Sequence, residues 1–184
     1  RTQFYQAFMP IHVSAERRRL LYCSILFEWF PGIPIYHSKD MKNWELYSHA
    51  LTNAEDPDLK KLPSAKGIWA PCLTYCEADD LFYVVYGVMN SMNARYFDVD
   101  NYLITAKDLR GPWSEPVYLH SSGFDASMFH DDDGKKYIVA LEWETRTEYE
   151  KPGPICIVEY DPAQKKSSGN AKSFLERRYR PWLY

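Results

Sequence analysis

Short runs of β-branched and aromatic residues, each bounded by turn residues, recur along the chain. They are Ile33–Tyr36, Leu81–Val88, Asn101–Ala106, Lys136–Trp143 and Ile155–Tyr160. Runs of this length and composition predict β-strands, and helical periodicity is hard to find anywhere in the sequence. The turn residues agree, because Asp131–Gly134 and, less strongly, Asp79–Asp80 precede strands as hairpin turns do. The sequence therefore predicts an all-β fold.

Two internal similarities indicate how the strands are grouped. The segment His37–Leu51 resembles Thr105–Leu119, since each has a strand end, Lys-Asp, an apolar residue, a short turn, a Trp and another strand. The segment Trp69–Tyr75, followed by an acidic turn and a strand, likewise resembles Phe124–His130. Units of about four strands that recur at irregular spacing are typical of β-propeller blades. Chance similarity between short β-hairpins is the alternative.

The second similarity singles out Asp125 among the acidic residues. It aligns Asp125 with Ala70, and in a propeller the innermost strand of each blade lines a central channel. A carboxylate at this position would therefore face the channel. Considered by residue type alone, Asp125 is also compatible with a turn or capping residue.

Composition narrows the classes of function. Because 22 basic residues are balanced by 25 acidic ones, an electrostatic nucleic-acid binder is not expected. No apolar run suggests a membrane span, and the spacing of the four cysteines predicts reduced thiols of a cytoplasmic protein rather than a zinc site. Asp131–Gly134 lacks the alternating oxygen ligands of a calcium loop and is predicted to be a turn. No cofactor or metal-ligating residue is predicted, and whether a metal lies in the channel is left open. Aromatic residues reach 16% and supply rings that could stack on a flat apolar ligand.

Four segments closely resemble glycoside hydrolase family 43, particularly its β-xylosidase branch: Phe27–Leu51, Gly67–Tyr75, Asp100–Leu119 and Gly123–Val139. The resemblance covers roughly residues 26–162. It implies a five-bladed β-propeller that cleaves xylosidic or arabinofuranosidic bonds with inversion. The substrates it implies are xylo-oligosaccharides or arabinoxylan fragments, and whether an intact protein is a homo-oligomer is left open.

The resemblance also assigns roles to residues. The family uses a general base Asp, a general acid Glu and a second Asp that tunes and orients the acid, and Asp125 falls on this second Asp. Phe27 and Trp69 fall on rings that wall the glycone pocket, and Phe124 and Ala70 also line it. A third carboxylate near the acid helps to keep it protonated, through like-charge repulsion. By residue type alone, Phe27 and Trp69 would be core aromatics.

The sequence departs from the family pattern at both ends. The family's base lies in an Asp-Pro-Ser context and its acid in a Glu-Gly-Pro-His motif, and neither motif is present. Two of the three catalytic carboxylates are therefore missing, and we expect little or no turnover by this polypeptide. A non-catalytic carbohydrate-binding propeller is the alternative function.

Reading-frame shifts offer one explanation of these departures. With suitably chosen codons, one-nucleotide shifts convert Arg18–Ile25 to Asp-Asp-Tyr-Tyr-Thr-Ala-Ala-Ser and Arg178–Tyr184 to Gly-Thr-Asp-Leu-Gly-Phe, both similar to the family. A two-nucleotide shift converts Phe8–His12 to Tyr-Ala-Asp-Pro. We therefore expect residues 1–25 and 173–184 to be out of frame, and residues 26–172 to form about two to three blades of an incomplete family 43 domain. A divergent relative with its own end sequences is the alternative, and secretion of a parent protein is left open.

Overall fold

The computed structural model describes residues 20–23, 30–53, 59–62, 66–93, 96–148, 153–168 and 172–175. Within these ranges the chain forms twelve β-strands and one short 3₁₀ helix, which confirms the predicted all-β fold. No helix in the same ranges is long and apolar enough to cross a membrane.

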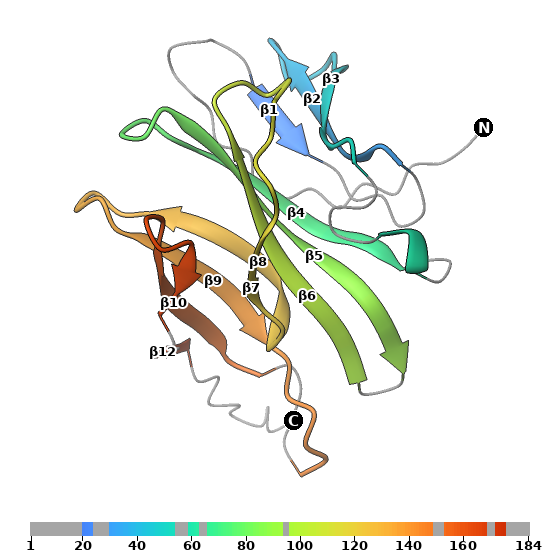
Figure 1. Ribbon diagram of the computed structural model, residues 1–184, viewed down its shortest axis with the longest axis vertical. Coiled ribbons are helices and arrows are strands. Elements are labelled where there is room, and N and C mark those ends of the chain that lie inside the picture. Colours follow the sequence, from blue (N-terminus) through green and yellow to red (C-terminus); the bar gives the residue numbers. More distant parts are fainter. Residues whose placement is uncertain are drawn as a thin grey trace, which may run out of the picture.

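The strands form three antiparallel sheets that follow one another along the chain (Figure 1). The first sheet has the order β1-β2-β3, with β1 at Leu20–Cys23, β2 at Gly32–Ser38 and β3 at Glu45–Leu51. After the 3₁₀ helix η1 (Leu59–Lys61), the middle sheet has the order β4-β5-β6-β7, with strands Gly67–Cys76, Leu81–Asn93, Tyr96–Ala106 and Val117–His120. The third sheet has the order β11-β10-β9-β8, and β12 also pairs with β10. Its strands β8 to β12 are Gly123–His130, Lys136–Glu142, Ile155–Asp161, Lys166–Ser167 and Lys172–Leu175.

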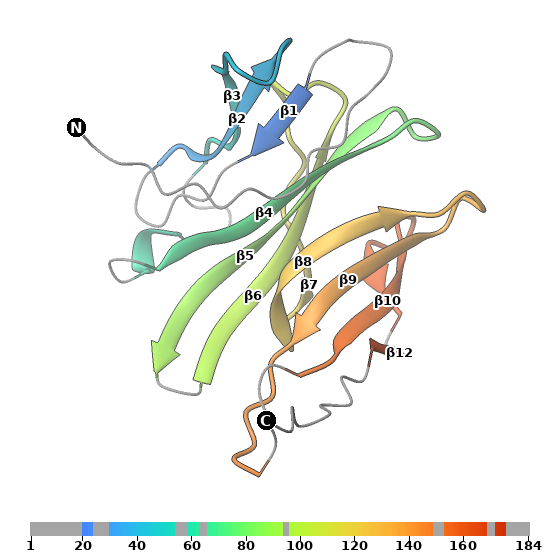
Figure 2. The same cartoon turned by 180° about the vertical axis from the view of Figure 1, so that it is seen from behind.

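The middle sheet is buried on both faces, because the first sheet packs on one face and the third on the other (Figure 2). Alternate residues of β5 divide between the two cores. Phe82 and Val84 face the first sheet, whereas Tyr83 and Val85 face the third. Burial on both faces explains why this strand is an uninterrupted apolar run instead of alternating with polar residues.

All five apolar runs of the sequence form strands, and the acidic tetrapeptide Asp131–Gly134 forms the turn between β8 and β9. In that turn Gly134 adopts a φ of 86°, a left-handed conformation that glycine tolerates without steric cost. The Lys-Asp pairs of the first similarity also share a role. Side-chain oxygens of Asp40 and Asp108 accept hydrogen bonds from backbone N–H groups of the turn that follows each. The three stacked sheets do not close into a ring within the described residues, and the partial propeller stays a prediction.

A buried ion pair joins the middle and third sheets where β4 and β8 end. The Lys136 ammonium, whose side chain is only 4% exposed, lies 2.6 Å from Oδ2 of Asp79. The Tyr83 hydroxyl donates a hydrogen bond of 2.6 Å to the same oxygen. The ammonium also lies 3.7 Å from Sγ of Cys76. We call Asp79, Tyr83 and Lys136 the inter-sheet ion pair, because they fix the end of β4 against the start of β9.

Candidate functional site

Strands β4 and β8 are edge strands of their sheets, contact one another, and carry the same irregularity. The pairing of β4 with β5 shifts within Trp69–Cys72, and the pairing of β8 with β9 shifts within Phe124–Ser127. At each place two residues lie opposite one, which defines a β-bulge. The first bulged residues are Ala70 and Asp125. Bulges redirect a side chain from the regular face of a sheet and are frequent next to active sites.

The backbone at these two positions is also alike. Ala70 has a φ of 39° and Asp125 a φ of 56°, both in the left-handed region. Aspartate tolerates this region better than most residues, because its short polar side chain can interact locally. Alanine has no such compensation, so the conformation of Ala70 is imposed by the surrounding fold. The two positions are structurally equivalent, as the sequence similarity predicts.

The Asp125 carboxylate is exposed, in contrast to the buried methyl group of Ala70. Among the described residues no side chain or backbone group forms a hydrogen bond or ion pair with it. Partial removal of water by the surrounding protein raises its pKa above the ordinary value of 3.8. Asp125 therefore combines a fixed backbone with a carboxylate that takes up a proton more readily than a solvated one.

Four aromatic rings gather beside the two bulges. The Phe97 ring contacts the other three, with centroid distances of 6.5 Å to Trp69, 5.6 Å to Phe124 and 4.6 Å to Trp143. The Phe124 and Trp143 rings are 5.2 Å apart. All four side chains are partly exposed, so they form a wall with an accessible apolar surface. We call Trp69, Phe97, Phe124 and Trp143 the aromatic wall.

The structure thus brings together four of the five site residues predicted from the sequence, namely Trp69, Ala70, Phe124 and Asp125, which occupy the two matching bulges. Phe27 lies outside the described residues. Sequence reasoning missed Phe97 and Trp143, which reach the wall from β6 and from the end of β9. Trp143 ends a predicted strand, but neither residue belongs to an internal similarity, so no pattern marked it.

Metal ligands do not gather at this site. In the part of the chain that the structure describes, no three His, Cys, Asp or Glu side chains lie close enough together to hold a metal ion. What the site offers is a carboxylate and an apolar wall. Sugar rings pack their C–H faces on aromatic side chains, and carboxyl groups carry out the acid–base steps of glycosidic bond hydrolysis. Glycoside hydrolases are a class of protein that uses this combination.

The family model for Glycosyl hydrolases family 43 matches residues 4–183, and the chain belongs to this family. It is 44% identical over 150 residues to a β-xylosidase of Bacillus subtilis, a match that covers 82% of this chain and 28% of that protein. It is 41% identical over 147 residues to xylosidase/arabinosidase 43B of Humicola insolens, which covers 80% of this chain and 27% of the relative.

Solved structures agree with the family assignment. The crystal structure of xylan β-1,4-xylosidase from Bacillus halodurans C-125 superposes with a TM-score of 0.81 at 41% identity. That superposition covers 85% of this chain and 30% of the other. The chain therefore spans less than a third of the length of these relatives.

Proposed function

We propose that this chain is part of an inverting glycoside hydrolase that acts on β-1,4-xylo-oligosaccharides or arabinose-decorated xylan fragments. Relatives described as β-xylosidase and xylosidase/arabinosidase support this substrate class. The observation that carries the proposal is the placement of Asp125, an exposed carboxylate of raised pKa on a bulged edge strand beside the aromatic wall. The three stacked sheets would be two to three blades of a five-bladed propeller.

In this proposal Asp125 acts on another carboxyl group rather than on the sugar. Inversion requires a general base that activates water and a general acid that protonates the leaving oxygen, at a separation of about 6.5–9.5 Å. A neighbouring negative charge raises the pKa of the acid and so keeps it protonated near neutral pH. Asp125 would supply that charge and orient the acid.

The aromatic wall would bind the glycone. Trp69 and Phe124 have this role by resemblance to the family, and Phe97 and Trp143 extend the same apolar surface. Ala70 leaves space at the position equivalent to Asp125, since its side chain is only a methyl group. A second candidate function, carbohydrate binding without catalysis, is favoured by this wall together with the absence of the Asp-Pro-Ser and Glu-Gly-Pro-His motifs from the sequence.

Two assays on the 184-residue chain test the expected inactivity and the role of the aromatic wall. Release of nitrophenol from an aryl β-xyloside should be negligible, because the sequence lacks the motifs of the base and the acid. Titration with xylobiose should change the tryptophan fluorescence, since Trp69 and Trp143 belong to the wall, and Trp143→Phe should reduce that change. Binding without cleavage is the expected result for this polypeptide. Appreciable turnover would overturn the predicted inactivity, and the absence of binding would overturn the role of the wall.

We also propose that residues 1–25 and 173–184 are translated out of frame, on either side of an incomplete domain at 26–172. The support is the family-like sequence that shifted frames give at three places. The match of the family model to residues 4–183 of the printed sequence opposes the proposal. The nucleotide sequence tests the proposal directly. Single-base insertions or deletions near these junctions should restore the Asp-Pro-Ser and Glu-Gly-Pro-His motifs, and a gene in which no such change restores them would contradict it.

A further inference from the structure

We propose that Asn101 is a positioning residue for Asp125, because its side-chain amide holds the turn from which the strand of Asp125 begins. This inference rests on the proposed function only in giving Asp125 a catalytic purpose. The positioning itself is a property of β6, the β7–β8 turn and the first residues of β8.

Asn101 lies on β6 and is completely buried. Its Nδ2 donates hydrogen bonds to two backbone carbonyls, that of His120 at 3.2 Å and that of Gly123 at 2.7 Å. These carbonyls are at the end of β7 and at the start of β8. One buried amide group therefore binds both sides of the turn that connects the middle sheet to the third sheet. We call these two hydrogen bonds the Asn101 clamp.

The turn bound by Asn101 is followed directly by the bulge of β8. Gly123 is two residues before Asp125 and packs so closely on β9 that an added Cβ would lie 1.7 Å from the carbonyl oxygen of Leu141. The backbone N–H of Trp143 donates a 2.9 Å hydrogen bond to the carbonyl of Ser122 in the same turn. The placement of the turn thus sets both the start of the strand that carries Asp125 and the start of the segment that carries Trp143.

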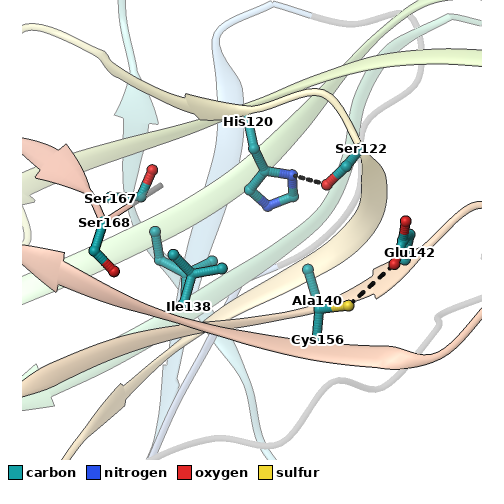
Figure 3. Close-up of a pocket in the computed structure, with 9 residues that line it drawn as sticks. His120, Ser122, Ile138, Ala140, Glu142, Cys156, Ser167 and Ser168 are labelled. Carbon is teal, nitrogen blue, oxygen red and sulfur yellow. Dashed lines mark hydrogen bonds between the residues drawn. The ribbon is translucent and has the colours of Figure 1, made fainter. Parts of the chain in front are cut away.

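On its other side, the turn is not held by close packing. His120 and Ser122 border a cavity of about 230 Å³, whose opposite wall includes Ile138, Ala140 and Cys156 (Figure 3). Among the described residues that line the cavity, the turn forms one side-chain hydrogen bond, of 3.2 Å between Ser122 Oγ and Nδ1 of His120. Ser167 of the same wall donates a 3.3 Å hydrogen bond to the carbonyl of Leu119, just before the turn. Close packing resists displacement, whereas a turn with a cavity on one side depends on its polar contacts from the other side.

Loss of the amide would leave the carbonyls of His120 and Gly123 buried without this donor, and an unsatisfied buried group is costly. The turn is then expected to shift toward the cavity, and the Asp125 carboxylate would gain water. Because burial is what raises the pKa of Asp125, the pKa should fall toward the ordinary value of 3.8.

Carbon-13 NMR titration of the Asp125 carboxyl group in the 184-residue chain tests the proposal without any sugar. Asn101→Ala should lower the pKa of Asp125 and shift the backbone amide signals of residues 124–126. Asn101→Ser, which keeps one donor, should give a smaller change in the same direction. Ser122→Ala is the matched control, because Ser122 lies in the same turn but its hydroxyl bonds to His120 at the end of β7 and forms no link to β6. It should leave the Asp125 signals unchanged.

A folded Asn101 variant with an unchanged Asp125 titration would overturn the proposal. Should neither variant fold, hydrogen exchange in the unmodified chain decides, since a clamped Asn101 side-chain amide must exchange slowly and fast exchange contradicts the clamp. Failure of xylobiose binding would overturn the proposed sugar-binding role of the aromatic wall and leave this result untouched, so that the two failures are distinguishable.

Discussion

The two ends of the neighbouring strands β4 and β8 differ in how their polar groups are satisfied. Where the strands end, the buried Lys136 ammonium is paired with Asp79, which also accepts a hydrogen bond from Tyr83. Near the start of the strands, the Asp125 carboxylate has no hydrogen-bond or ion-pair partner among the described residues. There the backbone is bulged and left-handed, and the four rings of the aromatic wall are partly exposed.

Under the proposed function, this difference separates a structural use of charge from a functional one. A buried charge must be paired, because an isolated one in a low-dielectric interior is strongly unfavourable. A charge that acts on a reacting group must instead be held in place and left accessible. Local departures from good packing and pairing cluster at functional sites, and the proposed site lies at the end of β4 and β8 where such departures occur.

The largest effect is expected from breaking the inter-sheet ion pair on its acidic side. Asp79→Asn would leave the ammonium of Lys136 buried without a counter-charge, at a cost of about 3 kcal/mol in the free energy of unfolding. Lys136→Met should cost less, since methionine fills the buried space and Asp79 is partly exposed and keeps the Tyr83 hydroxyl. Urea denaturation of both variants measures the difference. Equal losses would show that the pair contributes only packing.

The same ion pair should give the chain a specific sensitivity to acid. Burial opposes ionisation of Asp79, but hydrogen bonds from Lys136 and Tyr83 prevail and lower its pKa to about 2, below the ordinary 3.8. A carboxyl group with a lowered pKa contributes stability above its unfolded pKa and loses it as the pH falls through the folded value. The parent chain should therefore lose about 1 kcal/mol more than Asp79→Asn between pH 4 and pH 2, after allowance for solvent screening. Urea denaturation at the two pH values measures the free energies of unfolding. If both proteins lost the same amount between pH 4 and pH 2, the stabilising role of ionised Asp79 would be wrong.

Near the start of β4 and β8, the largest effect should come from Phe97, the ring at the centre of the aromatic wall. Phe97→Ala removes contacts with three rings and should lower the free energy of unfolding by about 1–2 kcal/mol, less than for a fully buried phenylalanine. It should also weaken the fluorescence response to xylobiose. Phe129→Ala is a suitable control, because Phe129 lies at the other end of β8, is 50% exposed and contacts only the Tyr137 ring among described aromatic residues. If both variants lost similar amounts of stability and of fluorescence response, the aromatic wall would have no special role.

The sequence predicts some features of these two ends and not others, for a physical reason. The strands follow from short apolar runs and turn residues, and the equivalence of Ala70 and Asp125 follows from a local similarity of seven residues. The Lys136–Asp79 pair, the Asn101 clamp and the position of Phe97 instead depend on how separate sheets pack, which no short-range pattern encodes. Even the run at β5 revealed a strand without revealing that both of its faces are buried.

The smallest effect is expected at Asp125, and its sign is opposite to the others. A carboxyl group whose pKa is raised by burial favours the protonated form in the folded state, so it lowers stability as the pH rises above its unfolded value of 3.8. Asp125→Asn removes this penalty and keeps a residue type that tolerates a φ of 56°. The variant should be more stable than the parent at pH 7, by less than about 1 kcal/mol because the carboxylate is exposed. The difference should vanish near pH 3, where both side chains are neutral. Thermal unfolding at the two pH values measures it, with Asp98→Asn as an exposed control on β6. A variant that is less stable at pH 7 would mean that Asp125 has a stabilising partner, and the contrast between the paired and unpaired ends of β4 and β8 would fail.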